Sequence, residues 1–300
     1  MNNWKYPPEW NRQTGTILIF PKKDSDWNCC FDEVQRDFLF FIKAIAKFQT
    51  VYLILEENID IQIPNVEIIQ NIKTDDTWAR DSLALTIIQD NGKKDFIDFQ
   101  FNGWGNKFPA YFDNRISEHF FQDNLIFNPF IIDGGAIETD GDNLLVTRTS
   151  ILNKNRYQFN RQEDIEVSLK KYLGVSNIIW LENSFLAGDD TDGHIDMLAR
   201  FGENNEVFYS LDNIGDEIKL HLPNKTFVKL PHPTFKNTPA TYLNFIFVNG
   251  GLLIPTYKVK EDEEALKIFQ IYFPTRKIIP IDSRIFIQQG GSLHCLTMQS

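Results

Sequence analysis

Apolar residues recur along this chain in two periods, one typical of helices and one typical of strands. Between positions 31 and 48 they fall at every third or fourth residue, which predicts a helix with one buried face. Shorter apolar runs at 50–55 and 66–69 are rich in β-forming residues and predict strands buried on both faces. Further helices are predicted at 113–121, 162–173 and 262–272.

Pairs of strands joined by tight turns alternate with these helices. The apolar runs 83–88 and 96–99 flank an Asp-Asn-Gly sequence that ends at Gly92, which is a strong hairpin signal. The other predicted pairs are 136–138 with 144–147, 197–201 with 207–210, and 242–248 with 252–255, and single strands are predicted at 177–181 and 277–281. The order hairpin, helix, strand recurs at intervals of roughly 50 to 60 residues without a Pro/Gly/Ser-rich linker. We therefore expect one domain, spanning 1–300, with a propeller-like array of β-rich units.

The segment 188–196 follows neither period. It holds four carboxylates, two glycines and one histidine, a set that cannot pack as core and must face solvent, a metal or a ligand. His194 and Asp196 are two residues apart where 195–201 reads as a strand, so we expect both side chains on one face and in one pocket. An acidic turn with a solvated histidine is the alternative, and a divalent metal site is a minor one.

Polar side chains also stand at the ends of other predicted strands. Asp81 precedes one strand, Asp133 follows another and is followed by two glycines, and Cys295 comes after a glycine-rich turn. Taken singly, Asp81 and Asp133 could be an ion-pair partner and a turn residue, and Cys295 a small buried apolar residue. Together with His194 they supply a thiol nucleophile, an imidazole that moves protons and carboxylates that bind a cation. This combination predicts a cysteine hydrolase that acts on a cationic amidine.

The charge of the chain narrows the range of its partners. Its formal net charge is -11 and its lysines and arginines form no cluster, which argues against a nucleic-acid or anionic-membrane surface and favours a small cationic ligand. No apolar run reaches about 18 residues and the first residues lack the apolar centre of a signal peptide, so we expect a soluble, cytoplasmic protein. The cysteines, Cys29, Cys30 and Cys295, form no disulfide framework, as is typical of a reducing compartment.

An ordered series of motifs along nearly the whole chain resembles the agmatine deiminase and bacterial (Porphyromonas-type) peptidyl-arginine deiminase family of the pentein, or guanidino-group-modifying, superfamily. The matching stretches are 8–10, 76–81, 101–105, 133–135 with 140–141, 152–156, 188–196, 243–245 and 290–295. The resemblance implies an α/β pentein fold, a five-bladed α/β propeller with pseudo-fivefold symmetry. It implies no metal and no organic cofactor. Because members of the family often form dimers, a homodimer is an open expectation.

The resemblance also implies roles for individual residues. Cys295 corresponds to the nucleophile and His194 to the proton shuttle. Asp81 and Asp196 correspond to the pair that holds the guanidinium. Asp133 stands where the family has the glutamate that steadies the histidine. Because the aspartate side chain is one methylene shorter, we expect a longer hydrogen bond to His194 and a lower rate.

The substrate implied by the resemblance is agmatine, hydrolysed to N-carbamoylputrescine and ammonia in putrescine synthesis. The loop 101–105 resembles the agmatine branch of the family and carries no arginine, which a substrate with a carboxylate usually needs. Trp78, Trp104 and Asp190 are the other predicted substrate-binding residues. Trp104 would cover the alkyl chain or the amine unless it packs in the core, and Asp190 would attract a second positive charge unless it caps the turn. The alternatives are a peptidyl-arginine or free-arginine deiminase on the same site, and a non-catalytic protein that binds guanidino compounds.

Overall fold

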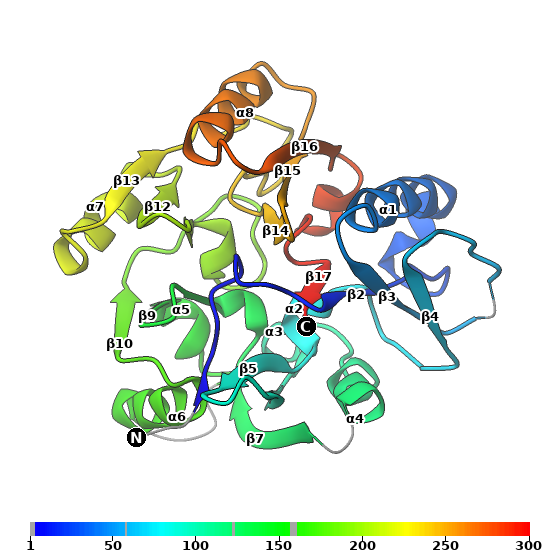
Figure 1. The fold of residues 1–300 in the computed structure, drawn as a ribbon, viewed down its shortest axis with the longest axis horizontal. Helices are drawn as coiled ribbons and strands as arrows, with labels where there is room; N and C mark the ends of the chain where they lie inside the picture. Colours follow the sequence, from blue (N-terminus) through cyan, green and yellow to red (C-terminus); the bar gives the residue numbers. More distant parts are fainter. Residues whose placement is uncertain (1–3, 58, 122–123, 157–160) are drawn as a thin grey trace.

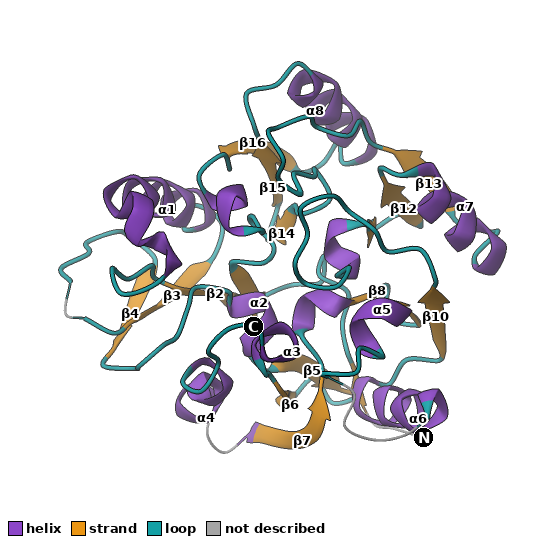
Figure 2. Ribbon diagram, turned by 180° about the vertical axis from the view of Figure 1, so that it is seen from behind, coloured by secondary structure: helices purple, strands orange, loops and turns teal. Residues whose placement is uncertain are grey.

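The computed structural model forms a ring of five sheets around a central axis (Figure 1). It describes residues 4–57, 59–121, 124–156 and 161–300. Within these ranges every sheet repeats one arrangement, an antiparallel strand pair whose second member also pairs in parallel with a third strand. A helix links the second strand to the third and lies at the periphery of the ring (Figure 2). The predicted recurrence of hairpin, helix and strand is therefore confirmed.

The sheets follow one another around the ring in sequence order (Figure 1). The first sheet consists of β2 (Gly15–Ile19), β3 (Thr50–Leu55) and β4 (Val66–Gln70) with β17 (Thr297–Gln299), and the second of β5 (Leu85–Gln89), β6 (Lys94–Gln100) and β7 (Leu125–Ile131) with β1 (Trp4–Lys5). The third sheet consists of β8 (Ile137–Thr139), β9 (Asn143–Thr147) and β10 (Asn177–Leu181), and the fourth of β11 (Ala199–Phe201), β12 (Glu206–Tyr209) and β13 (Thr226–Lys229). The fifth sheet consists of β14 (Ile246–Val248), β15 (Gly251–Thr256) and β16 (Lys277–Asp282). The peripheral helices are α1 (Phe31–Ile45), α4 (Ile116–Phe121), α6 (Gln162–Leu173), α7 (Asp212–His221) and α8 (Glu261–Tyr272). The short helices are α2 (Ala79–Ser82), α3 (Gly103–Asn106) and α5 (Arg148–Ile151), and the 3-10 turns include η1 (Asp26–Cys30), η4 (Gly134–Ala136), η5 (Ile195–Met197) and η6 (Phe286–Gln289).

The two ends of the chain share one sheet and so close the ring. β17 pairs antiparallel with β2, with Thr297 opposite Leu18 and Gln299 opposite Thr16. The C-terminus consequently lies near the centre of the ring, beside α2 (Figure 1). This closure places Cys295, two residues before β17, among turns that come from the middle of the chain.

α1 shows how the apolar period produces the peripheral helices. The residues that it buries recur at helical spacing, as predicted: Val34, Phe38, Phe41, Ile42 and Ile45. The rings of Phe38 and Phe41 pack against Phe286 of η6, near the centre of the molecule. Burial of this face, rather than helix propensity, stabilises the element. Among the helices that the structure describes, none combines the length and the apolar character needed to cross a membrane.

The structure corrects the predicted strand 195–201. Only β11 is extended, because the three residues of η5 form a turn in which the Leu198 amide donates to the Ile195 carbonyl at 2.9 Å. The predicted strand 242–248 is likewise confined to β14. The predicted helix 113–121 is a 3-10 turn, Asp113–Arg115, followed by α4.

Several elements were predicted only in part or not at all. β7 contains Asn128 and Pro129, which are disfavoured inside a strand pattern. α7 carries Gly215 in its interior, which lowers helix propensity. Neither segment therefore carries a clean local signal. In the structure β7 pairs with β6, and α7 contacts β10, β12 and β13.

Candidate active site

A cavity of about 190 Å³ lies where turns from several sheets converge. Six of the residues singled out in the sequence line it: Trp78, Asp81, Trp104, Asp190, His194 and Cys295. Asp133 and Asp196 are fully buried behind this wall, where they contact His194 and Cys295 respectively. The predicted residues are therefore brought together, although they come from positions more than 200 residues apart in the chain.

Gly135 permits the convergence of the acidic and basic groups. A Cβ atom at this position would lie 2.8 Å from Asp81 Oδ1 and from His194 Nδ1, and 3.2 Å from Asp196 Oδ2. Only a glycine leaves room for all three side chains around the same backbone. The three groups belong to α2, to the residue that precedes η5, and to η5 itself. Although 195–201 is not one strand, His194 and Asp196 still approach the same point.

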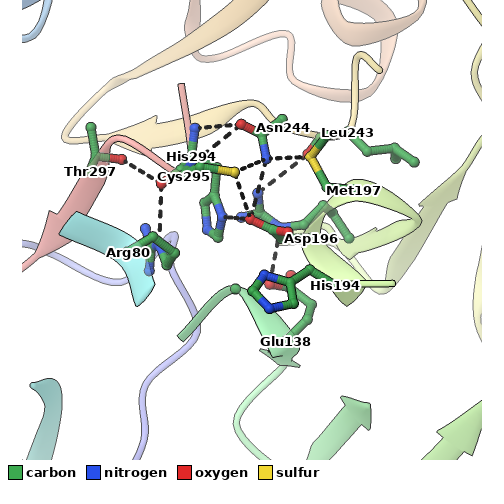
Figure 3. Close-up of polar contacts among 12 residues, drawn as sticks. Arg80, Glu138, His194, Asp196, Met197, Leu243, Asn244, His294, Cys295 and Thr297 are labelled. Carbon is green, nitrogen blue, oxygen red and sulfur yellow. Dashed lines mark hydrogen bonds and ion pairs between the residues drawn. The ribbon is translucent and has the colours of Figure 1, made fainter. Parts of the chain in front are cut away.

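The thiol of Cys295 lies beside Asp196 and Asn244 (Figure 3). Its Sγ is 3.6 Å from Asp196 Oδ2 and 3.1 Å from Asn244 Nδ2, which donates to it. Burial raises the pKa of Cys295 well above its usual value, and the charges of Asp196 and Asp81 raise it further. A cation placed against the two carboxylates would cancel their negative potential and favour the thiolate.

His194 is held between two carboxylates. Its Nε2 is 3.0 Å from Asp133 Oδ2, and its Nδ1 is 3.6 Å from Asp81 Oδ1. Burial alone would lower the pKa of His194, but the charges of Asp81 and Asp133 outweigh it and raise the pKa to about 9. His194 is therefore an imidazolium at neutral pH. The distance of 3.0 Å is ordinary for a hydrogen bond, so the shorter Asp133 side chain still reaches the imidazole. A bond longer than that of the family's glutamate, and a lower rate, stay predictions.

Arg156 supports Asp133 from the other side, a role that the sequence did not reveal. Its Nε is 2.8 Å from Asp133 Oδ2, and its Nη1 donates to Asp192 Oδ2 at 2.8 Å. Burial would raise the pKa of Asp133, but the hydrogen bond from His194 and the Arg156 charge outweigh it and lower the pKa below the usual value. Arg156 lies in the motif stretch 152–156, which is the signal that could have identified it.

Asp81 and Asp196 differ in how their oxygens are bound. Asp81 accepts hydrogen bonds at both oxygens, from the Gly135 amide at 2.8 Å and from the Trp104 indole at 2.9 Å. Asp196 Oδ2 accepts from His294 Nδ1 at 2.7 Å, whereas its buried Oδ1 has no partner among the described residues. Burial and neighbouring negative charges raise the pKa of Asp81. The same two causes raise the pKa of Asp196 to about 7. Two adjacent acids with a free buried oxygen are suited to a planar cation with several donors.

Trp78 and Asp190 both form part of the cavity wall. The Trp78 indole donates to Asp76 Oδ2 at 3.0 Å, and its ring stands beside Gly291, close to the thiol. Asp190 lies near Gly290, where a Cβ would be 3.2 Å from its Oδ1. Burial and the neighbouring Asp189 raise the pKa of Asp190. Both residues therefore have positions from which they could contact a ligand.

A buried charged network behind Asp196 was missed in the sequence. His294 binds Asp196 (Figure 3). Beyond it, ion pairs link Glu9 to Arg200 and Arg200 to Glu138, the latter at 3.0 Å. Burial and the nearby Arg200 lower the pKa of His294 well below its usual value, so its ring is neutral. Within the described ranges, no three His, Cys, Asp or Glu side chains are grouped so as to hold a metal ion.

Comparison with known families gives a match over almost the whole chain. The family model of the Porphyromonas-type peptidyl-arginine deiminase matches residues 5–300. An agmatine deiminase of Pseudomonas aeruginosa (strain LESB58) is 27% identical over 353 residues, which cover 99% of this chain and 95% of the relative.

Solved structures are similar over the same length. An agmatine deiminase of C. jejuni, with a cysteine replaced by serine and substrate bound, gives a TM-score of 0.93 at 35% identity and covers 99% of this chain and 96% of its own. A DDAH of Pseudomonas aeruginosa gives a TM-score of 0.60 at 11% identity and covers 96% of this chain and 100% of its own, a likeness of fold alone. These neighbours confirm the predicted pentein fold.

Proposed function

Because the chain belongs to the Porphyromonas-type peptidyl-arginine deiminase family, we propose that it hydrolyses the guanidinium group of agmatine to N-carbamoylputrescine and ammonia. The observation that carries the proposal is the convergence of a thiol, an imidazolium and two carboxylates on one small cavity. The product would enter putrescine synthesis. The cytoplasmic location, a single catalytic domain over 1–300 and a homodimer belong to the same proposal.

Substrate binding would use the two acids. A guanidinium stays charged at every physiological pH, and its planar donors match carboxylates in a bidentate manner. Asp81 and Asp196 would hold the plane of the cation, with the unpartnered Oδ1 of Asp196 accepting one of its hydrogen bonds. The bound cation offsets the charges that raise the pKa of Cys295, so the thiolate forms in the presence of substrate.

The chemical steps would use Cys295 and His194 in turn. The thiolate attacks the guanidinium carbon and forms a tetrahedral adduct. His194, an imidazolium at neutral pH, gives its proton to the departing ammonia, which leaves an S-alkylthiouronium on Cys295. The neutral His194 then takes a proton from water, whose oxygen attacks the same carbon. Collapse of this second adduct releases the ureido product and restores the thiolate.

The walls of the cavity favour agmatine over arginine. Asp26, Asp76 and Asp190 line it in addition to Asp81, and no lysine or arginine is among the described residues of the lining. A second ammonium group suits this surface, whereas the carboxylate of arginine would meet like charge. A volume of about 190 Å³ also suits a small molecule better than a peptide.

The test is ammonia release from agmatine, arginine and a blocked arginine peptide, with the ureido product identified by mass spectrometry. We expect agmatine to give a kcat/KM at least about 100-fold above the others, since a misplaced charge costs several kcal/mol. The control Cys295→Ala should lose more than about a thousandfold in kcat. Preference for the peptide would favour the peptidyl-arginine alternative, and binding of agmatine without turnover would favour the non-catalytic one.

A further inference from the structure

A left-handed turn of four consecutive residues lies beside the cavity. Gly103, Trp104, Gly105 and Asn106 have φ values of 63°, 54°, 85° and 64°. Residues other than glycine enter this region rarely and as single residues, because their Cβ approaches the following carbonyl. Trp104 and Asn106 both do so here, within one turn. Such strain in a folded chain is found where the surroundings hold it and the position of a side chain depends on it.

Contacts on both sides hold the turn in this conformation. Before it, the Asn102 side chain accepts a hydrogen bond from the Gly105 amide at 2.9 Å, and the Asn102 carbonyl accepts one from the Asn106 amide at 2.9 Å. After it, Lys107 Nζ lies 2.9 Å from Asp192 Oδ2, in the acidic segment that carries His194. The turn is therefore held internally by Asn102 and attached by Lys107 to the acidic segment.

The turn directs the indole of Trp104 to Asp81. Its Nε1 donates to Asp81 Oδ2 at 2.9 Å, and the rings of Phe101 and Phe108 pack edge-on against the indole with centroids 5.0 and 5.5 Å away. The other Asp81 oxygen accepts from the Gly135 amide at 2.8 Å. Both oxygens of the carboxylate are thus fixed by donors that carry no charge.

The lack of charge on these donors matters for the reaction. Asp133, which steadies His194, is paired with the Arg156 cation. Asp81 already lies 3.6 Å from the His194 imidazolium, and a lysine or arginine in the place of Trp104 would add a second cation beside a carboxylate that has to attract a cationic substrate. An indole N–H cannot ionise or accept a proton, so it orients the carboxylate and leaves its charge available.

We propose that Trp104 is a positioning residue for Asp81, and that the left-handed turn is the device that holds its indole N–H at the carboxylate. This inference rests on the proposed function of the site. It gives Trp104 a defined role in substrate binding, distinct from a cover over the alkyl chain.

The test compares Trp104→Phe with a matched control. The variant keeps an aromatic ring between Phe101 and Phe108 and removes the N–H. The control Trp180→Phe removes an indole donor from a carboxylate outside the cavity, since Trp180 Nε1 of β10 donates to Glu166 of α6 at 2.7 Å. For Trp104→Phe we expect KM for agmatine to rise roughly 10- to 100-fold and kcat to change less than about threefold. This pattern is expected because the variant would bind the substrate and the transition state more weakly by the same amount. The control should keep KM within about twofold of the wild type.

Two results would overturn the inference. One is an unchanged KM in Trp104→Phe, and the other is a loss of activity that follows the loss of folded protein measured by circular dichroism.

A second measurement needs no substrate. In the ¹⁵N NMR spectrum of the tryptophan indoles, Asp81→Asn should shift the Trp104 resonance and leave the Trp180 resonance in place. If the wild type proves inactive toward every guanidino compound, the proposed function fails. The NMR result then decides the positioning role alone, and an unmoved Trp104 resonance overturns it.

Discussion

The carboxylate of Asp133 lies between a histidine and an arginine, and each of them affects its charge. Its Oδ2 is 3.0 Å from His194 Nε2 and 2.8 Å from Arg156 Nε. The shorter side chain therefore still reaches the imidazole, and the Arg156 cation keeps the carboxylate ionised. At the scale of single residues, the site consists of groups whose charges are set by neighbours that the primary sequence does not place beside them.

The charge of Asp133 should be visible in the pH profile. It is one of the charges that raise the pKa of His194 to about 9, so Asp133→Asn should lower this pKa. Protonated His194 is needed to release ammonia, and we expect the basic limb of kcat/KM for agmatine to move down by about one pH unit. The control Asp142→Asn removes an exposed carboxylate that pairs with Lys5 at 2.8 Å and should leave the limb in place. A basic limb that is the same in both variants would contradict the assignment.

His194 should also make the stability of the fold depend on pH. Its pKa in the folded chain is raised to about 9, so its contribution to the free energy of unfolding is complete below its unfolded pKa, near 6.5, and is lost as the pH rises through 9. Urea unfolding of the wild type should show a decrease of up to about 3 kcal/mol across this window. In His194→Gln the free energy of unfolding should fall less across the same pH window, by the contribution of His194. Equal slopes in the two proteins would show that His194 is not charged in the folded state.

The turn formed by α3 requires glycine at position 103. A Cβ at Gly103 would lie 2.1 Å from the Phe108 carbonyl oxygen, at a φ of 63°. Gly92 has a φ of 83° but nothing within 4 Å of its Cβ position. The two positions share the left-handed backbone and differ in the space around it.

The comparison of Gly103→Ala with Gly92→Ala separates strain from steric conflict. Gly92→Ala should cost about 1 to 2 kcal/mol of unfolding free energy, the penalty of a left-handed alanine. Gly103→Ala should cost at least about 2 kcal/mol more, and it should raise KM because the turn can no longer direct Trp104. Urea unfolding and agmatine kinetics measure the two effects. Similar losses of unfolding free energy in the two variants would mean that the α3 turn adjusts to accept a Cβ at position 103 without steric conflict.

The elements also show where local pattern predicts structure and where it does not. α1 was predicted because its apolar residues repeat at helical spacing, and α6 because Gly174 marks its end, where the structure has a left-handed cap. η5 was predicted as part of a strand because its residues alternate in polarity, yet Asp196 turns inward to bind His294. Where a segment carries site residues, hydrogen bonds of the tertiary structure override its local preference.

At the scale of the whole molecule, the ring is closed by the last residues of the chain. β17 pairs with β2, and Gln299 contributes a side-chain acceptor to Arg80 at 2.7 Å and a carbonyl to Thr86 at 3.1 Å. Arg80 lies next to Asp81, and Cys295 lies just before β17. The pairing of β17 with β2 therefore closes the ring and also positions Cys295 in the site.

Removal of residues 297–300 tests this connection. We expect the truncated chain to lose several kcal/mol of stability, because an edge strand disappears together with the buried hydrogen bonds of Gln299 to Arg80 and Thr86, and to lose activity with it. Thermal unfolding followed by circular dichroism measures the loss. Cys295→Ala is the control, since it removes the nucleophile and keeps β17. A truncated chain that unfolds at the same temperature as Cys295→Ala would show that closure does not stabilise the ring.

The sequence by itself determined the order of the elements and the kinds of chemistry available. Its apolar periods specify most helices and hairpins, and its motifs single out Cys295, His194, Asp81 and Asp196. Glu9, Arg156, Asn244 and His294 stand in motif stretches too, but nothing in their spacing indicates their partners.

Only the tertiary structure decided which side chains meet and in which charge state. Asp81, His194 and Cys295 stand in turns that precede β5, β11 and β17, which belong to three different sheets, and they line one cavity because the closed ring brings these turns together. The pKa of each group depends on which groups surround it in the folded structure. Burial and neighbouring charges act over a few ångströms of space, whatever the separation along the chain.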